Sequence, residues 1–304
     1  MSRFITRRIT FIVLVCIAII FLSYLGMGMI RNSETNSPNY NLIPQIKIAW
    51  SQSHNYIFSM LKGEVALGLS QAGPPGGNAG RGSPYLNSMA LLVIALGGAT
   101  LIGLPLGTFA ALTKYKKLVF PLLLLVLVGI STPTFFSGFL LQQLEIYSAF
   151  YFDKKLVSVA GFGWDIEHML LPVLVLAARP LAYLTRTSFI VISRVMEDDY
   201  IRTAYAKGLG QRRVVNIHAM RNVAVPILTA VGISLRFSLG SLPIVEFLFF
   251  WPGIGLRLLE AIESRQVANM VTMTLSLGLT ILAVNLILDI IYRFVDPRTR
   301  GNDL

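Results

Sequence analysis

The sequence predicts an all-α, polytopic membrane protein with six transmembrane helices, and three observations support this fold class. The 304 residues are 54% hydrophobic and only 13% charged, whereas a soluble domain is closer to a quarter charged. Several apolar runs reach about twenty residues, which is long enough to cross the core of a bilayer as a helix. The polar segments between these runs differ in positive charge from one side to the other, as the orientation of membrane helices requires.

The first expected transmembrane helix occupies residues 1–30, with its apolar run at 9–30. A basic head precedes that run, as it does in a signal peptide: Arg3, Arg7 and Arg8. The run is longer than a typical signal core, and no Ala-x-Ala-like cleavage site follows it. We therefore expect an uncleaved helix with its N-terminus in the cytoplasm. Cys16 within it is the single cysteine, which excludes a disulfide framework and a cysteine-based metal site.

Residues 31–83 are expected to form an extracytoplasmic loop. Residues 73–77 read Gly-Pro-Pro-Gly-Gly, and similar residues continue to Pro84. This composition cannot hold a helix, so we interpret the tract as a flexible linker, with a contact for an external partner as the alternative. Short interfacial helices are expected over about 46–69.

The transmembrane core, residues 84–293, holds the other five expected spans. The second span covers 85–112, and its glycines would let another helix approach closely: Gly97, Gly98, Gly103 and Gly107. The third covers about 118–144 and contains Pro133, which should kink the helix or break its hydrogen-bond ladder.

The remaining spans are expected at residues 169–192, about 223–250 and 270–291, followed by a cytoplasmic tail at 294–304. Arg179 and Arg186 lie toward the inner end of the fourth span, where we expect their side chains to snorkel to the interface. An even number of spans places both chain ends in the cytoplasm.

The distribution of charge agrees with this orientation. Cations are more numerous in the segments assigned to the cytoplasm, and the outside cations are offset by nearby acids. The opposite orientation would reverse this bias. The net charge of +11 is therefore explained without a nucleic-acid partner.

The longest polar run between two apolar segments is residues 197–229. The cytoplasmic loop expected there covers residues 194–222, and we call it the docking loop. Its acids stand only at its head, at 197–199, where a helix N-terminus favours negative charge and a capping oxygen. Gly208 and Gly210 should stop that helix. A second helix is expected over 212–220, with an apolar stripe made by Val214, Val215, Ile217 and Met220. A helix, tight turn and helix would then lie across the inner mouth of the bundle.

The docking loop and four other stretches match a recognisable pattern. Residues 199–209 fit D-Y-[VI]-R-T-A-x-A-K-G-L, and residues 213–226 fit R-x-x-x-x-H-A-x-R-N-x-x-x-P. Elsewhere the chain has L-P-L-G-x-x-A-A-L at 104–112, S-x-P-x-F-x-x-G at 131–138, V-E-x-x-F-x-W-P-G-[LI]-G at 245–255 and D-P-R at 296–298. On these residues it resembles the inner-membrane permease subunits of binding-protein-dependent ATP-binding-cassette (ABC) importers, in the dipeptide, oligopeptide and nickel branch.

The resemblance covers about residues 83–300 and implies a type I importer permease fold that forms half of a pore. It implies that a coupling helix in the docking loop enters a cleft of a cytoplasmic ATPase, whose closure switches the pore between inward-open and outward-open states. The ATPase-coupling residues carried over are Arg202, Ala204, Ala206, Lys207, Gly208, Arg212 and Arg213.

The resemblance also implies the partners and the location. These are a second, homologous permease subunit, two ABC ATPase subunits, an extracytoplasmic substrate-binding protein and the lipid of a bacterial-type inner membrane. No G-x-x-x-x-G-K-[ST] phosphate loop occurs in the chain. We therefore expect a transport subunit rather than an enzyme, with no cofactor of its own and with ATP and magnesium held by the ATPases. No histidine or cysteine cluster has metal-ligand spacing, so no metal site is expected.

Two residues are candidates for the translocation path. Arg236 falls near the middle of the fifth span, where a charge is costly unless it faces a cavity or a partner. We hypothesise that it lines the path and attracts a carboxylate, such as a peptide C-terminus. The alternative is a structural pair with an acid on a neighbouring helix or on the partner permease. Pro133 is the second candidate.

Peptide is the substrate that the branch implies, and nickel chelates or other small solutes are the alternative. A secondary transporter or channel without an ATPase would predict inverted repeats and charged relays within the spans. The chain shows no internal repeat and few intramembrane acids, and this alternative leaves the docking loop unexplained. An intramembrane enzyme would need a catalytic constellation at membrane depth, and the sequence shows none.

Overall fold

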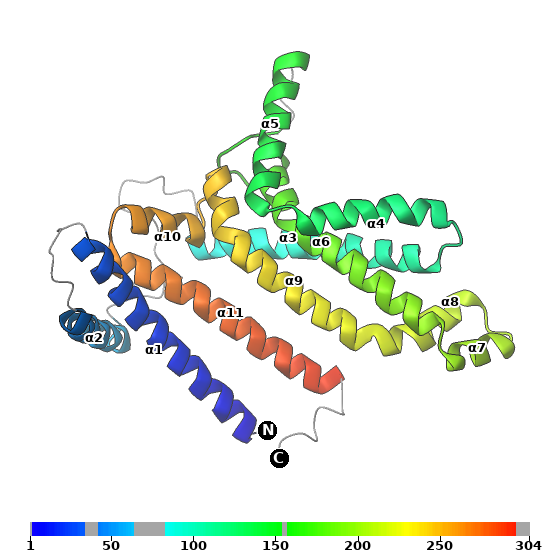
Figure 1. The fold of residues 1–304 in the computed structure, drawn as a ribbon, viewed down its shortest axis with the longest axis horizontal. Helices are drawn as coiled ribbons and strands as arrows, with labels where there is room; N and C mark the ends of the chain where they lie inside the picture. Colours follow the sequence, from blue (N-terminus) through cyan, green and yellow to red (C-terminus); the bar gives the residue numbers. More distant parts are fainter. Residues whose placement is uncertain (1, 34–41, 64–82, 154–156, 296–304) are drawn as a thin grey trace. The chain divides into compact units, whose positions relative to one another are not determined.

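The computed structural model describes residues 2–33, 42–63, 83–153 and 157–295, which form helices joined by short connections (Figure 1). In chain order the helices are α1 (Ser2–Ser33), α2 (Leu42–Leu61), α3 (Pro84–Leu112), α4 (Lys116–Ser131), α5 (Thr134–Phe152), α6 (Ile166–Met196), α7 (Asp199–Ala206), α8 (Gln211–Arg213), the π-helix η1 (Val214–Ala219), α9 (Met220–Phe249), α10 (Ile254–Glu263) and α11 (Val267–Val295). Most of the Gly/Pro tract, the D-P-R element and the tail from residue 296 lie outside the described residues.

Five helices are long and apolar enough to cross a membrane unbroken, and one bent helix pair can supply a sixth crossing. The five stretches are Thr6–Ile30, Pro84–Leu112, Ile166–Met196, Gln211–Phe249 and Val267–Ile291. The pair is α4 and α5, whose axes differ by 110°. The prediction of an all-α membrane protein is confirmed, and the helices supply the six expected spans when the bent pair α4–α5 counts as one broken span.

The break between α4 and α5 follows from Pro133. Thr132 is extended at φ −74° and ψ 126°, because the residue before a proline is disfavoured in the helical region. Its N–H still donates to the Val128 carbonyl at 2.9 Å, so α4 keeps its last turn. Pro133 then starts α5, and its carbonyl accepts from the N–H groups of Phe136 and Ser137, both at 3.1 Å. The sequence left a kink or a break open, and the structure shows a break.

The described residues fall into two compact units, one within Met1–Met89 and Phe250–Leu286 and the other within Ala90–Phe249 and Ile287–Leu304. In the second unit α6 and α9 run side by side (Figure 1). The residues that α9 buries are small along much of its length: Ala230, Gly232, Ser234 and Ser238. Small side chains let the helix backbones approach closely, as in other membrane bundles.

Helix α3 meets α6 through two of its glycines. A Cβ added at Gly107 would lie 2.3 Å from the Thr185 carbonyl oxygen, and one at Gly103 would lie 3.0 Å from the Leu181 carbonyl oxygen. These two positions confirm the close approach expected from the small-residue pattern. Gly97 and Gly98 were expected to do the same, but an added Cβ there meets no atom within 4 Å. They lie two turns nearer the start of α3, away from this contact.

The connection from α5 to α6 is tied to the end of α9 by hydrogen bonds. The Gln142 amide donates to the carbonyls of Val159 and Leu248 at 3.1 and 3.0 Å, and the Gly161 N–H donates to the Phe249 carbonyl at 2.8 Å. Asp165 caps α6 by accepting from the His168 N–H at 3.0 Å. The hydrogen bond from the His168 side chain, followed by that from its backbone, holds the pKa of the Asp165 carboxyl below its ordinary value.

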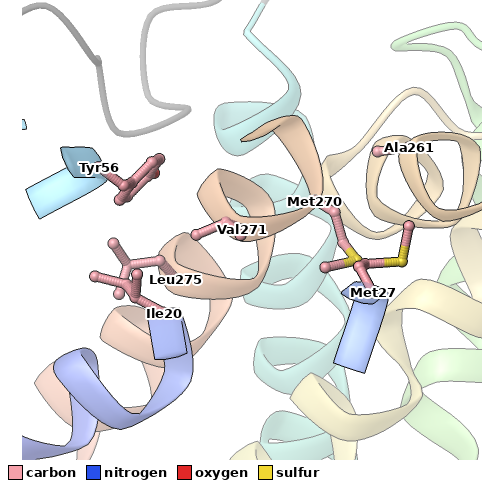
Figure 2. Packing of buried hydrophobic residues seen from close by; sticks show 7 residues of the cluster. All are labelled: Ile20, Met27, Tyr56, Ala261, Met270, Val271 and Leu275. Carbon is pink, nitrogen blue, oxygen red and sulfur yellow. The ribbon is translucent and has the colours of Figure 1, made fainter. Parts of the chain in front are cut away.

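In the first unit, residues 42–61 form one helix where several short interfacial helices were expected. Helix α2 packs on α1 through edge-to-face ring pairs, Phe21 with Trp50 and Tyr24 with Tyr56. The Tyr56 hydroxyl also shares a hydrogen bond of 2.8 Å with Thr272 of α11. Figure 2 shows the apolar cluster that joins these helices: Ile20, Met27, Tyr56, Ala261, Met270, Val271 and Leu275. Helix α2 therefore packs on α1 and α11, and its composition alone did not predict these partners.

The W-P-G element is held by the start of α3. The Asn87 side chain donates to the Pro252 carbonyl at 2.9 Å, and the Trp251 indole N–H donates to the Asn87 carbonyl at 3.3 Å. The Ser88 hydroxyl accepts from the Ile254 N–H at 2.8 Å and so caps α10. These hydrogen bonds satisfy backbone groups that have no partner within a helix between the end of α9 and the start of α10.

We predict that Gly107→Ala destabilises the protein by about 1–3 kcal/mol, because its methyl group would press into the backbone of α6. Gly98→Ala in the same helix is the matched control. It meets open space and should be neutral or stabilising by up to about 1 kcal/mol through helix propensity. Thermal unfolding of the purified protein in one detergent compares the two variants. Equal midpoints for both would contradict the α3–α6 contact.

Candidate functional site

The docking loop is a folded structure between the fourth and fifth spans. Helix α7 is followed by a turn at 207–210, and α8 then continues through η1 into α9 without a break. The stretch Gln211–Phe249 is 39 residues long, so the second helix of the loop and the fifth span form one continuous element. The predicted helix and tight turn are present.

The first turn of α7 is capped by its backbone. Asp198 occupies the capping position in an extended conformation, but its side chain makes no capping hydrogen bond. Its carbonyl accepts from the Ile201 N–H at 3.0 Å. Asp199 pairs with Arg202 at 3.5 Å, and the two side chains are 97% and 74% exposed, so the pair contributes little to stability. The expected capping oxygen therefore does not come from these carboxylates.

The end of α7 is a Schellman motif built on Gly208. The Gly208 N–H donates to the Tyr205 carbonyl at 2.9 Å, and the Leu209 N–H donates to the Ala204 carbonyl at 3.3 Å. Gly208 has φ +76°, a left-handed conformation that costs other residues free energy. Gly210 has φ −68° and carries no such requirement. The two glycines therefore play different parts, which their spacing in the sequence does not distinguish.

A small apolar cluster holds the docking loop together. Its buried members are Ile201, Ala204, Val214 and Ala219, and the partly buried members packed against them are Val195, Met196 and Leu209. The cluster joins α7 to the last turn of α6 and to η1. An isolated helix of eight residues is unstable in water, so α7 depends on these contacts.

A hydrogen bond adds a second connection across the loop. The Asn222 side chain of α9 donates to the Tyr200 hydroxyl of α7 at 2.6 Å. Both residues belong to the pattern quoted from the sequence. The bond ties the start of α7 to the first turn of α9, so α7 is fixed to both neighbouring spans.

The predicted coupling residues separate into two groups. Ala204 is 5% exposed and belongs to the cluster, so its small side chain lets α7 pack against η1. The others are exposed on the loop surface: Arg202, Ala206, Lys207, Gly208, Arg212 and Arg213. Ala206 lies on the face of α7 opposite Ile201, since the two are five residues apart on a helix of 3.6 residues per turn.

The π-helical turn η1 changes which side chains face inward. Val214 and Val215 are buried as expected, but Ile217 is 55% exposed and Met220 is 37% exposed. A π-turn inserts an extra residue and rotates the face that follows it. Val215 and Met220 border a groove of about 540 Å³ with part of α3, lined by Leu104, Pro105, Thr108, Phe109, Leu112, Thr113, Val215, Asn216 and Met220. The sequence analysis missed this groove, because no residue pattern marks a π-turn.

The path candidates lie on different elements. Pro133 stands at the break between α4 and α5. Arg236 is exposed on the middle of α9 and takes part in an interaction of its own. The Arg179 guanidinium lies 4.5 Å from the centre of the Phe237 ring on α9. Tyr183 packs edge-on against the same ring, with centres 5.6 Å apart.

The chain is similar to known proteins. Residues 103–301 match the family described as "Binding-protein-dependent transport system inner membrane component". The dipeptide transport system permease protein DppB of Escherichia coli (strain K12) is 28% identical over 344 aligned residues, covering 99% of each chain. The oligopeptide permease protein AppB of Bacillus subtilis (strain 168) is 31% identical, covering 70% of this chain and 68% of AppB. The glutathione permease protein GsiC of Salmonella typhimurium is 31% identical, covering 82% and 79%.

We predict that Gly208→Ala weakens the docking loop by about 1–2 kcal/mol, because an alanine must adopt the left-handed conformation at φ +76°. Amide hydrogen exchange of α7 in the purified protein should accelerate about tenfold. Gly208→Asn should cost less, since asparagine tolerates this conformation. Gly210→Ser, at an ordinary φ and with an improved capping residue, should leave exchange unchanged or slower. Equal effects of alanine and asparagine would refute the role given to Gly208.

Proposed function

The chain belongs to the family of binding-protein-dependent transport system inner membrane components, and from this premise we propose that it forms half of the membrane pore of a peptide importer. The family match covers residues 103–301, which include the docking loop. The relatives named above carry dipeptides, oligopeptides and glutathione. The chemistry common to these names is the peptide, so peptide import is favoured over nickel or other small solutes. A channel or secondary transporter is not favoured.

The proposed assembly contains this chain, one second homologous permease, two ATPase subunits and an extracytoplasmic binding protein. The family description supports the binding protein directly. The ATPases supply ATP and magnesium, because this chain has no phosphate-loop sequence. In this assembly the chain transmits the conformational change and forms part of the substrate path, and the ATPase subunits hydrolyse ATP.

The orientation that we propose places both termini and the docking loop in the cytoplasm of an inner membrane. It rests on the excess of basic residues in the docking loop and the chain ends. This orientation puts the exposed face of α7 where a cytoplasmic ATPase can reach it.

The observation that carries the coupling mechanism is that the docking loop is fixed to both adjacent spans. The apolar cluster includes Val195 and Met196 of α6, and the Tyr200–Asn222 bond reaches α9. A displacement of α7 by an ATPase therefore moves the inner ends of α6 and α9 together. Because these two spans also pack along their length, the motion reaches membrane depth.

The translocation path that we propose includes the break at Pro133 and the exposed face of α9 at Arg236. Irregular backbone at membrane depth is tolerated only where protein buries it or where it lines a cavity. Thr132 and Pro133 supply such a segment within the third span. Arg236 stands at mid-helix, where a charge marks a substrate pathway or an internal pair.

We predict that Ala206→Trp uncouples ATP hydrolysis from substrate. Ala206 is exposed and helical, so the bulky ring leaves the fold of the loop intact and blocks close approach of the ATPase. Overpacking a fitted contact costs about 1–3 kcal/mol, which lowers productive docking about tenfold or more. The measurement is ATPase activity of the reconstituted assembly, with and without peptide-loaded binding protein.

Ala206→Ser is the control for this experiment, because it changes the same position with little added volume. It should respond to loaded binding protein like the wild type. Gly208→Trp would be ambiguous, since it adds backbone strain to steric bulk. If Ala206→Trp assembles with the ATPases and is stimulated normally, the docking loop is not the coupling element.

A further inference from the structure

One exposed face of α6 carries two arginines at membrane depth. Arg179 and Arg186 are seven residues apart, which places them on the same side of the helix and about 10 Å apart along its axis. Both are exposed in the second unit. They lie well inside the span Ile166–Met196. The face therefore presents a row of guanidinium groups along the direction of transport.

Arg179 is held in place by aromatic side chains rather than by an acid. Its guanidinium stacks on Phe237 at 4.5 Å, and Tyr183 braces that ring from the edge. Stacking occupies the flat face of the group and leaves its N–H edges available. These edges match the two oxygens of a carboxylate.

The helices around this face offer no opposite charge. Helices α3 and α4 contain no acid, and the acids of α6 and α9 are Glu167, in the first turn of α6, and Glu246, buried near the far end of α9. Helix α5, which also packs on α6, carries Glu145, which is buried and accepts from the Val157 N–H at 2.9 Å. Arg179 and Arg186 form no ion pair with any residue that the structure describes. Arg236 lies on α9 and takes part in a separate interaction, so it is not counted among the arginines of this face.

Exposed arginines at this depth need water, an anion or an acid from another subunit. Contact with the lipid core is disfavoured by the cost of placing a charge there. A static pair with another subunit would satisfy one position, but the chain repeats the guanidinium along the helix axis, and Phe237 holds the first of the two in place. This arrangement fits an anion that moves along the helix.

We propose that this face of α6 is a carboxylate track, on which Arg179 and then Arg186 bind the C-terminal carboxylate of a passing peptide. The proposal rests on the function proposed above and adds the chemical group that the pore recognises. Recognition of the terminal carboxylate is independent of the side chains. It therefore suits a pore whose relatives are named for dipeptides, oligopeptides and glutathione.

A cysteine reporter on the same face tests the track. Ile190 is 49% exposed and lies four residues after Arg186. The reporter variant is Ile190→Cys in a Cys16→Ser background, because Cys16 is the only native thiol in the chain. In the complete assembly, its reaction rate is compared for an anionic and a cationic methanethiosulfonate of similar size, each normalised to a free thiol.

A guanidinium about 6 Å from the thiol should favour the anionic reagent and disfavour the cationic one by about threefold each, which is about tenfold in their ratio. Arg186→Gln should reduce this ratio toward one, and Arg186→Lys should preserve it. Leu174→Cys is the matched position on another face of α6, 47% exposed, and should react slowly with both reagents. An unreactive Ile190→Cys, or a ratio that Arg186→Gln leaves unchanged, overturns the track.

Protection of the Ile190→Cys thiol from labelling by a peptide tests whether the C-terminal carboxylate is the group that binds. Alanyl-alanine in excess should slow labelling of Ile190→Cys, and its C-terminal amide should not. Equal protection by the two peptides overturns carboxylate recognition. The function proposed above is tested separately, by stimulation of ATPase activity by loaded binding protein in the unlabelled wild type. If Ile190→Cys reacts selectively with the anionic reagent but loaded binding protein does not stimulate the ATPase, peptide import is contradicted. The cationic character of this face of α6 is then still supported.

Discussion

Within a bilayer every backbone N–H and C=O must find a partner inside the protein, and this constraint governs the features on which the structure depends. The chain is helical almost wherever it is described, so the informative places are those where a helix stops. At Thr132 the last N–H of α4 still bonds Val128 while Pro133 turns the chain by 110°. At Gly208 a Schellman motif closes α7. At the W-P-G element, Asn87 and Ser88 of α3 provide the partners that the chain lacks. At each interruption, backbone groups therefore find partners within the protein.

The coupling that we propose depends on how the interruption in the docking loop is packed. Helix α7 is too short to be stable alone, and its order comes from burying Ile201 and Ala204 against η1 and the end of α6. The surface that remains is polar and exposed. Stability and docking are thus assigned to opposite faces of eight residues. A force on the outer face is transmitted because the inner face has no freedom to slide.

Local sequence chemistry predicted much of this arrangement. Apolar runs located the spans, Pro133 marked the break and Gly208 marked the end of α7, because each effect acts within a few residues. Nonlocal contacts escaped prediction. The helical partner of α2 lies on α1 and α11, and the stacking of Arg179 depends on Phe237, 58 residues later in the chain. Gly97 and Gly107 have the same chemistry, and only the position of α6 decides which one is indispensable. The burial of Ala204 likewise depends on tertiary packing, and the exposure of Ile217 depends on the π-turn η1.

The carboxylate track has a consequence for the other half of the pore. A peptide at neutral pH carries an ammonium group as well as a carboxylate. In the described helices α3, α4, α6 and α9 the exposed charges away from the helix ends are cations, and the one exposed acid is Glu167 in the first turn of α6. Two identical copies facing one another would double the positive field and repel the ammonium group. A homologous but different partner can place acids or carbonyls opposite Arg179 and Arg186. Peptides could then be held by both charged ends across the two subunits. The distribution of charge on this one chain therefore favours a pore built from two unlike permeases.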